Sequence, residues 1–270
     1  PADIPKEGAI FDLPIAVGIL EVTNQLTDRP DVFFVGELSL NGDIKPVRGI
    51  ISICELISKQ PNKRLCLPFE NLHEASLITS VDLIPIKHLR DILTIFSQKH
   101  TFSKLDSVVK QPSYSYDYSD VKGQLFGKRA IEIAAAGKHN ILLIGPPGSG
   151  KSMLLKRLPS ILPHLTEEEA ISTFKIQSIS HQHFKKAAFS FEKPFRAPHH
   201  SISYAGLVGG GSKPLPGEIS LAHNGVLFLD ELAEFPRRVL EVLRQPLENK
   251  QIVISRANMS IFYPANFLLV

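Results

Sequence analysis

A glycine-rich segment of eight residues carries the clearest chemical signal in the sequence. It reads Gly145-Pro146-Pro147-Gly148-Ser149-Gly150-Lys151-Ser152 and fits the pattern G-x-x-x-x-G-K-[ST] of a phosphate-binding loop, the P-loop. Glycines let the backbone N–H groups of such a loop surround phosphate oxygens without a clash from a Cβ atom. We expect all eight residues to bind a nucleotide, with Lys151 reaching the β- and γ-phosphates of ATP and the Ser152 hydroxyl binding Mg²⁺.

Two acidic residues could complete this site. The apolar run over residues 226–229 is followed directly by Asp230 and Glu231. Alone, these acids would be read as the cap of a strand. After a P-loop, however, an acid at the C-terminal end of a buried parallel strand is expected to lie beside that loop. We expect Asp230 to orient Mg²⁺ and Glu231 to polarise the attacking water, which makes Glu231 and Lys151 the candidate catalytic residues.

The elements that would position these residues have an α/β pattern. A buried strand is predicted over residues 140–144, a helix over 151–158 and a central parallel strand over 226–230. Capping, turn and apolar patterns predict further elements: helices over 129–136, from 166 and over 236–245, a hairpin with strands over 251–255 and 261–263, and a strand from 267.

The first 97 residues have the pattern of a separate α/β unit. The predicted elements are strands over 32–40 and 64–68, a turn at Asn41-Gly42, and helices over 49–58 and 70–79. Residues 98–120 then lose any sustained period and become rich in Ser, Tyr and Lys. The predicted organisation is therefore a domain over 1–97, a linker over 98–120 and a second domain over 121–270.

Histidines and a Gly- and Pro-rich stretch offer weaker signals. His181, His183, His199, His200 and His223 match no zinc spacing, so we interpret them as surface or packing residues. The stretch over residues 195–217 also contains Arg196 and Lys213. It is either an exposed loop or a segment that reaches an anion, and its periodicity does not decide between the two.

Composition and charge exclude several classes. Of the 270 residues, 43% are hydrophobic and 21% are charged, which excludes a wholly disordered chain. No apolar run approaches the ~18 residues of a membrane span, and residues 1–6 lack the apolar core of a signal peptide. Cys54 and Cys66 cannot form a disulfide framework, so we expect two buried thiols and a cytoplasmic protein without a membrane partner.

Charge is unevenly distributed along the chain. Residues 1–100 hold ten Lys and Arg against thirteen Asp and Glu, a net charge of −3. Residues 120–270 hold eighteen against twelve, a net charge of +6. The basic excess of the second half is a mild indication of an anionic partner there.

Six segments, taken in order, resemble the magnesium-chelatase-like AAA+ ATPases of the YifB/ComM family. They are residues 120–124 (DVKGQ), 145–152 (GPPGSGKS), 195–200 (FRAPHH), 209–211 (GGG), 216–223 (PGEISLAH) and 227–231 (LFLDE). The FRAPHH and PGEISLAH segments are far more specific than the P-loop. The resemblance covers the chain from about residue 1 to its end and implies an AAA+ ATPase domain over residues 121–270.

In related ATPases two elements face the central pore of a ring. By resemblance, these would be a helix-2 insertion around residues 195–217 and a hairpin over residues 250–264. The resemblance implies that Arg256 on the hairpin, and Lys213 or Arg196 on the insertion, contact a nucleic-acid backbone. The positive net charge of this half is consistent with such a role.

The first hundred residues resemble the Lon-protease-like domain that precedes the ATPase in this family. Residues 36–49 (GELSLNGDIKPVRG) match the Lon-type hairpin and the loop after it. By alignment, Ile15 stands at the position of the catalytic serine and Ile53 near that of the lysine. Neither side chain can act as nucleophile or base, so we expect a peptidase-inactive domain that serves in oligomerisation or DNA binding.

The chain starts at Pro1 and ends at Val270 inside an apolar run, which we interpret as signs of a C-terminally truncated protein. By resemblance, the sensor-1 asparagine, the arginine finger, sensor 2 and the lid would lie beyond Val270. Because an arginine finger contributes ~10³–10⁵ to the rate in related enzymes, we expect the chain alone to be nearly inactive.

The resemblance implies an ATP-binding motor, a homohexameric DNA helicase that promotes branch migration during recombination of transforming DNA. One alternative is a magnesium-chelatase-type ATPase subunit, which the Lon-like domain disfavours. Another is a truncated nucleotide-binding module with little activity of its own. An active Lon-like peptidase is disfavoured by Ile15 and Ile53.

Overall fold

The structure is a computed structural model that describes residues 8–26, 31–97, 114, 116–180, 191–211, 214–256 and 259–270. These residues form two compact units: unit 1, with described residues 8–97, and unit 2, with described residues from 114 to 270. Of the predicted linker, residues 98–113 and 115 lie outside the described residues. Its last residues form η3 (Tyr118–Asp120), and Tyr118 is buried in a core of unit 2.

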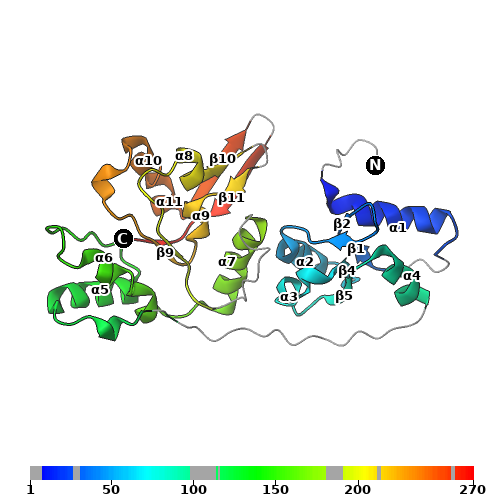
Figure 1. Cartoon of the computed structure of the whole chain (residues 1–270), viewed down its shortest axis with the longest axis horizontal. Coiled ribbons are helices and arrows are strands. Elements are labelled where there is room, and N and C mark those ends of the chain that lie inside the picture. The colour runs from blue at the N-terminus through cyan, green and yellow to red at the C-terminus, as the bar shows by residue number, and fades with distance from the viewer. Residues whose placement is uncertain are drawn as a thin grey trace. The chain divides into compact units, whose positions relative to one another are not determined.

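Unit 1 is an α/β unit around a small parallel sheet (Figure 1). Its elements are η1 (Ala9–Phe11), α1 (Asp12–Val22), β1 (Phe33–Phe34), β2 (Glu37–Leu38), β3 (Ile44–Lys45), α2 (Ile50–Ser58), β4 (Arg64–Pro68), η2 (Phe69–Asn71), α3 (Leu72–Ala75), β5 (Asp82–Ile86) and α4 (Leu89–Ser97). The strand order is β1-β4-β5, and β2 pairs with β3 in a separate antiparallel ribbon.

Side chains that alternate along β4 place helices on both faces of this sheet. Cys66 belongs to a cluster with Leu13 of α1 and Ile92 of α4. Successive residues of a strand point to opposite faces, so Leu65 and Leu67 face away from that cluster. Figure 1 shows α2 and α3 on the side of the strands away from α4. Both cysteines are buried and free, as predicted, and burial raises the pKa of the Cys54 thiol to about 12.

In unit 1, the predictions of helix or strand are mostly confirmed, but the predicted lengths of these elements are often wrong. The strand over 64–68 and the helix over 49–58 are β4 and α2, with Gly49 as the N-cap of the helix. The predicted strand over 32–40 is divided into β1 and β2. The predicted helix over 70–79 is reduced to η2 and α3. Gly42 has φ 91° in the connection between β2 and β3, which explains the turn at Asn41-Gly42.

Unit 2 contains more elements, several of them short. They are η3, α5 (Leu125–Gly137), α6 (Lys151–Leu155), η4 (Leu158–Ile161), α7 (Glu167–Ile179), β6 (Phe195–Arg196), α8 (Tyr204–Val208), β7 (Gly209–Gly210), β8 (Leu215–Pro216), α9 (Glu218–Leu221), β9 (Val226–Leu227), η5 (Leu232–Glu234), α10 (Arg237–Glu241), α11 (Arg244–Asn249), β10 (Gln251–Arg256), β11 (Met259–Pro264) and β12 (Leu268–Leu269).

The central sheet of unit 2 has the strand order β12-β9-β6, and all three strands are parallel. The apolar run after Gly225 alternates between two cores: Val226 and Phe228 join one cluster, and Leu227 and Leu229 join the other. The first cluster includes α5, α6 and η4, while the second includes α8 to α11 and the β10–β11 hairpin. Figure 1 shows these two groups on opposite sides of β9. The prediction of a central parallel strand is thereby confirmed, but the strand predicted over 226–230 is shortened to Val226–Leu227, and Asp230 follows it in a turn.

The strand predicted over residues 140–144 is wrong as a buried strand. These residues have no assigned strand, although the Ile141 N–H donates to the Leu269 carbonyl of β12 over 3.1 Å. Ile141 and Leu143 pack against the core, but Leu142 and Ile144 are 64% and 89% exposed. The segment alternates like a strand beside β12, yet only one of its faces is covered by the described residues.

Several local predictions for unit 2 are confirmed. Thr166 and Glu169 form both hydrogen bonds of the predicted capping box at the start of α7. The predicted hairpin is β10 paired with β11, with Arg256 opposite Met259. Two helices are corrected in length: the one predicted over 151–158 ends at Leu155, and the one over 236–245 is divided into α10 and α11.

The stretch over residues 195–217 is more ordered than an exposed loop. It contributes β6, α8, β7 and β8, and Leu207 and Val208 are buried in the core.

Among the described residues, no helix is both long enough and apolar enough to cross a bilayer.

Candidate functional site

The P-loop turns between residue 144 and the start of α6. Gly148 and Gly150 have φ values of 75° and 83°, and Gly150 is the N-cap of α6. A side chain at either position would be strained, because residues with a Cβ atom rarely adopt positive φ. The two glycines therefore allow the tight curve that brings backbone N–H groups to the N-terminus of α6.

Lys151 folds back over this loop. Its ammonium Nζ donates hydrogen bonds to the carbonyls of Gly145, at 2.8 Å, and Pro146, at 2.9 Å. The Ser149 hydroxyl lies 3.3 Å from the same nitrogen. The loop thus encloses a fixed positive charge beside the N-terminus of a helix, an arrangement suited to phosphate.

The P-loop and the acids after β9 meet directly. Ser152 Oγ donates to Asp230 Oδ2 over 2.9 Å, although the two residues are 78 positions apart. A hydroxyl and a carboxylate are hard oxygen donors, and Mg²⁺ in nucleotide sites is commonly held by one or two protein oxygens together with phosphates. These two side chains fit a Mg²⁺ ion that is bound together with a nucleotide.

Glu231 lies beside this pair in an unusual conformation. Its φ is 55°, its side chain is 70% exposed, and its N–H donates to Asp230 Oδ1 over 3.1 Å. His200 Nδ1 lies 3.8 Å from Glu231 Oε2, and the His200 ring stacks on His199 at 3.9 Å. Sequence reasoning interpreted both histidines as surface or packing residues. The FRAPHH segment was the available signal for this contact.

Gln124 is a second residue to which the sequence assigned no role. Its side-chain Nε2 donates to the carbonyl of Ser149 in the P-loop over 2.7 Å. The only available signal was its place in the DVKGQ segment, because nothing in local periodicity predicts a contact 25 residues away.

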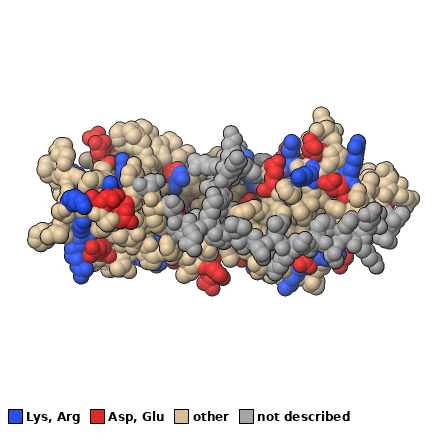
Figure 2. Space-filling view, turned by 60° about the horizontal axis from the view of Figure 1, so that its bottom comes forward, with Lys and Arg blue, Asp and Glu red and all other residues tan. Residues whose placement is uncertain are grey.

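Of the three candidate DNA-binding residues, only Arg196 has a side chain that the structure describes. The Arg196 guanidinium forms two hydrogen bonds of 2.6 Å with the Glu218 carboxylate. Arg256 is the last residue of β10, but its side chain lies outside the described part of the chain. Lys213 also lies outside the described residues. On the face drawn in Figure 2, basic and acidic side chains are interspersed.

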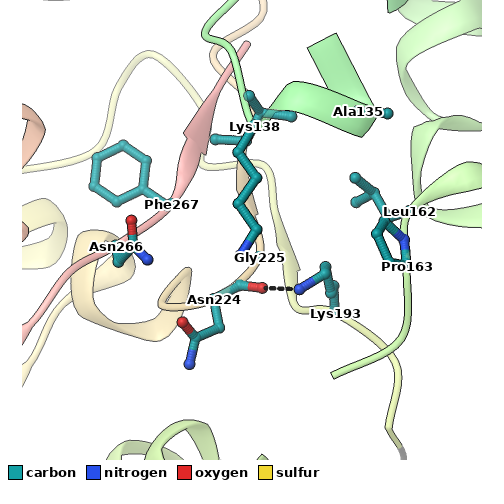
Figure 3. A pocket seen from close by; sticks show the side chains of 10 residues that line it. Ala135, Lys138, Leu162, Pro163, Lys193, Asn224, Gly225, Asn266 and Phe267 are labelled. Carbon is teal, nitrogen blue, oxygen red and sulfur yellow. Dashed lines mark hydrogen bonds between the residues drawn. The ribbon is translucent and has the colours of Figure 1, made fainter. Parts of the chain in front are cut away.

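A pocket lies at the other end of the sheet from these acids. Among the residues that line it are Gly225, which precedes β9, Leu268, which starts β12, and the side chains of Lys138 and Lys193 (Figure 3). Asp230 follows the opposite, C-terminal end of β9. In proteins with an open parallel sheet, ligands bind at the edge where the C-terminal ends of the strands lie. This pocket lies at the opposite edge, so it is not the expected nucleotide site.

A partly buried polar network adjoins the pocket. Glu169 Oε1 pairs with Lys138 Nζ at 3.1 Å, and Oε2 pairs with Lys193 Nζ at 3.4 Å. His223 accepts the Asn266 N–H at Nδ1 over 3.1 Å, while its Nε2 lies 3.0 Å from Ser172 Oγ. Burial disfavours a second proton on this ring, and although Glu169 acts in the opposite direction, the pKa of His223 falls to about 4.

Comparison with known proteins places this site in a family context. The family described as magnesium chelatase, subunit ChlI, matches residues 117–270, and a second model, subunit ChlI of Mg-chelatase, matches residues 1–71. Competence protein ComM of Haemophilus influenzae is 46% identical over 279 residues, and the uncharacterized protein YifB of Escherichia coli is 45% identical over 275 residues. Each alignment covers 100% of this chain and 54% of the relative, so the chain spans about half the length of these curated relatives. Lon protease 2 of Bacillus subtilis is 30% identical over 95 residues, which cover 34% of this chain and 17% of that protein.

The His223→Gln variant tests the partly buried network. The folded-state pKa of about 4 is below the ordinary 6.5, so the unfolded chain takes up a proton first as the pH falls. The contribution of neutral His223 to stability is complete above pH 6.5 and is lost between 6.5 and 4, by up to about 3 kcal/mol. The variant should lose that part of the pH dependence in urea unfolding followed by tyrosine fluorescence. His164→Gln, a change at an exposed histidine, should keep it, and equal pH profiles for His223→Gln and the unmodified chain would contradict the assignment.

Proposed function

Because this chain belongs to the family of magnesium chelatase, subunit ChlI, with relatives in the ComM and YifB group, we propose that it binds ATP. The P-loop and Asp230 would bind the nucleotide together with Mg²⁺. The parallel order of β12, β9 and β6 accords with the α/β AAA+-like fold of this family. The observation that carries the proposal is the 2.9 Å hydrogen bond from Ser152 Oγ to Asp230 Oδ2, which joins the two motifs.

Each group has a defined task in this proposal. Backbone N–H groups of residues 145–150 and the Lys151 ammonium bind the phosphates, and Ser152 and Asp230 hold Mg²⁺. A Mg²⁺ ion held there would supply positive charge that stabilises the phosphates during transfer. Glu231, whose carboxylate is exposed beside Asp230, accepts a proton from the attacking water and orients it toward the γ-phosphate. His200 faces the Glu231 carboxylate from the β6 side.

Lys151→Ala should weaken the binding of MgATP to this chain by about 10- to 100-fold, because a charge-assisted contact with phosphate is lost. Isothermal titration calorimetry measures the dissociation constant directly. Lys156→Ala, a change at an exposed lysine just after α6, is the matched control and should bind as tightly as the unmodified chain. Equal affinity for Lys151→Ala and Lys156→Ala would refute the P-loop assignment.

Glu231→Gln should leave the affinity for MgATP unchanged and slow ATP hydrolysis by the full-length protein at least ~100-fold, since a neutral amide cannot accept the proton. Phosphate release gives the rate, and calorimetry gives the affinity. Glu234→Gln, three residues further on in η5, should retain both. Hydrolysis at the normal rate in Glu231→Gln would assign the base to another group.

The finer proposal is a motor that acts on DNA. We propose a homohexameric helicase-type ATPase that promotes branch migration during natural transformation and recombination. The similarity to a protein named Competence protein ComM supports this proposal, as does the β10–β11 hairpin with Arg256 at the end of its first strand. Arg196 is the weaker candidate for a DNA contact, because its guanidinium is already paired with Glu218.

Residues 1–97 are proposed to form a Lon-like domain without peptidase activity. The 30% identity to Lon protease 2 over 95 residues supports the likeness. Ile15 lies on α1, at the position that alignment gives to the serine of the Lon dyad, and Ile53 lies on α2, near the position of the lysine. The remaining alternative is a magnesium-chelatase-type ATPase subunit, which the matches to ChlI family models favour. Stimulation of ATP hydrolysis by single-stranded DNA would favour the motor over the chelatase.

Arg256→Ala should weaken binding to a single-stranded oligonucleotide and reduce the slope of log affinity against log salt by about 1, because one phosphate contact no longer releases a counterion. Fluorescence anisotropy over a series of salt concentrations measures the slope. Lys250→Gln removes a positive charge just before the other end of β10 and should leave the slope unchanged. If the slope does not change in Arg256→Ala, the hairpin does not contact the DNA backbone.

A further inference from the structure

Gln124 combines an unusual backbone with a contact to the P-loop. It is the N-cap of α5, with φ 54° and ψ 39°, a left-handed conformation that residues with a Cβ atom rarely adopt. Its side-chain Nε2 donates to the Ser149 carbonyl over 2.7 Å. Such backbone outliers cluster at functional sites, where surrounding structure holds them in place. The outlier here lies next to the proposed phosphate site.

The absence of a side chain at Gly150 makes room for the Gln124 amide. A Cβ atom at Gly150 would lie 2.7 Å from Gln124 Nε2, a distance too short for a real contact. A Cβ atom at Gly127 of α5, in contrast, would make an ordinary contact of 3.7 Å with Gln124 Oε1. The exposed amide therefore lies close against Gly150, with its donor end on the Ser149 carbonyl.

The contact fixes the direction of one peptide unit. In a trans peptide the C=O and the following N–H point in opposite directions. Because the Ser149 carbonyl points at Gln124, the Gly150 N–H points away from it. Gly150 is the N-cap of α6, and free N–H groups at the start of a helix are the groups that bind phosphate.

We propose that Gln124 is a positioning residue for the P-loop. Its side chain holds the Ser149–Gly150 peptide so that the N–H of this peptide is presented to a phosphate of the nucleotide. The inference rests on the proposed ATP-binding function. Without the Gln124 donor, this peptide can rotate, and phosphate binding has to fix it again. A hydrogen bond of this kind corresponds to about a fivefold change in affinity.

The Gln124→Gly variant separates this role from a purely structural one. Glycine adopts the left-handed conformation without strain, so the thermal unfolding midpoint of the variant should stay within a few degrees of that of the unmodified chain. The donor is gone, so the dissociation constant for MgATP should rise about fivefold in calorimetry. Gln124→Ala should show the same rise in dissociation constant together with a lower unfolding midpoint.

Lys138→Gly is the matched control. Lys138 is the left-handed residue at the other end of α5, with φ 53°, and does not contact the P-loop. Its replacement should leave MgATP affinity unchanged. If Gln124→Gly binds MgATP as tightly as the unmodified chain, the inference about Gln124 is wrong but the proposed ATP binding stands. The same holds if Lys138→Gly loses as much MgATP affinity as Gln124→Gly. If the unmodified chain does not bind MgATP, the proposed function fails and the inference fails with it.

Discussion

The hydrogen bond between Ser152 and Asp230 depends on apolar packing that neither residue provides. A single exposed hydrogen bond contributes about 1 kcal/mol, which is too little to hold α6 against β9. Leu154 and Leu155 of α6 are buried in the same cluster as Val226 and Phe228, and each fully buried side chain of this size contributes about 2 kcal/mol. The apolar core therefore fixes the distance between the P-loop and Asp230, and the hydrogen bond between Ser152 and Asp230 is a consequence of that distance.

Two of the left-handed residues of unit 2 lie at the proposed site and also depend on the packing around them. Gln124 donates a hydrogen bond to Ser149 in the P-loop, and Glu231 donates one to Asp230. Each conformation costs on the order of 1–3 kcal/mol and persists only where the surrounding structure enforces it. Because β9 is buried between two parallel neighbours, it provides a rigid base from which Asp230 and Glu231 extend.

Local patterns predicted the parts of the fold that depend on few residues. The capping box at Thr166 and the hairpin of β10 and β11 require only neighbours in sequence, and both were predicted. The P-loop and its acids were predicted to meet because strand order imposes it. The contacts of Gln124 with Ser149 and of His200 with Glu231 were not predicted, since they depend on how distant segments pack. Residues 140–144 were predicted as a buried strand because they are apolar. An apolar sequence does not show which face of a segment is covered by other elements.

The half-covered segment before the P-loop also affects how the chain behaves in solution. Leu142 and Ile144 expose most of their side-chain surface, and burying each one would gain about 2 kcal/mol. Two exposed apolar side chains on the same face of an extended segment form an apolar patch, which favours association with another apolar surface. Lys138 and His139, which directly precede the segment, supply the polar flank that limits such association. These two side chains are therefore among the exposed apolar groups through which copies of this chain can associate in solution.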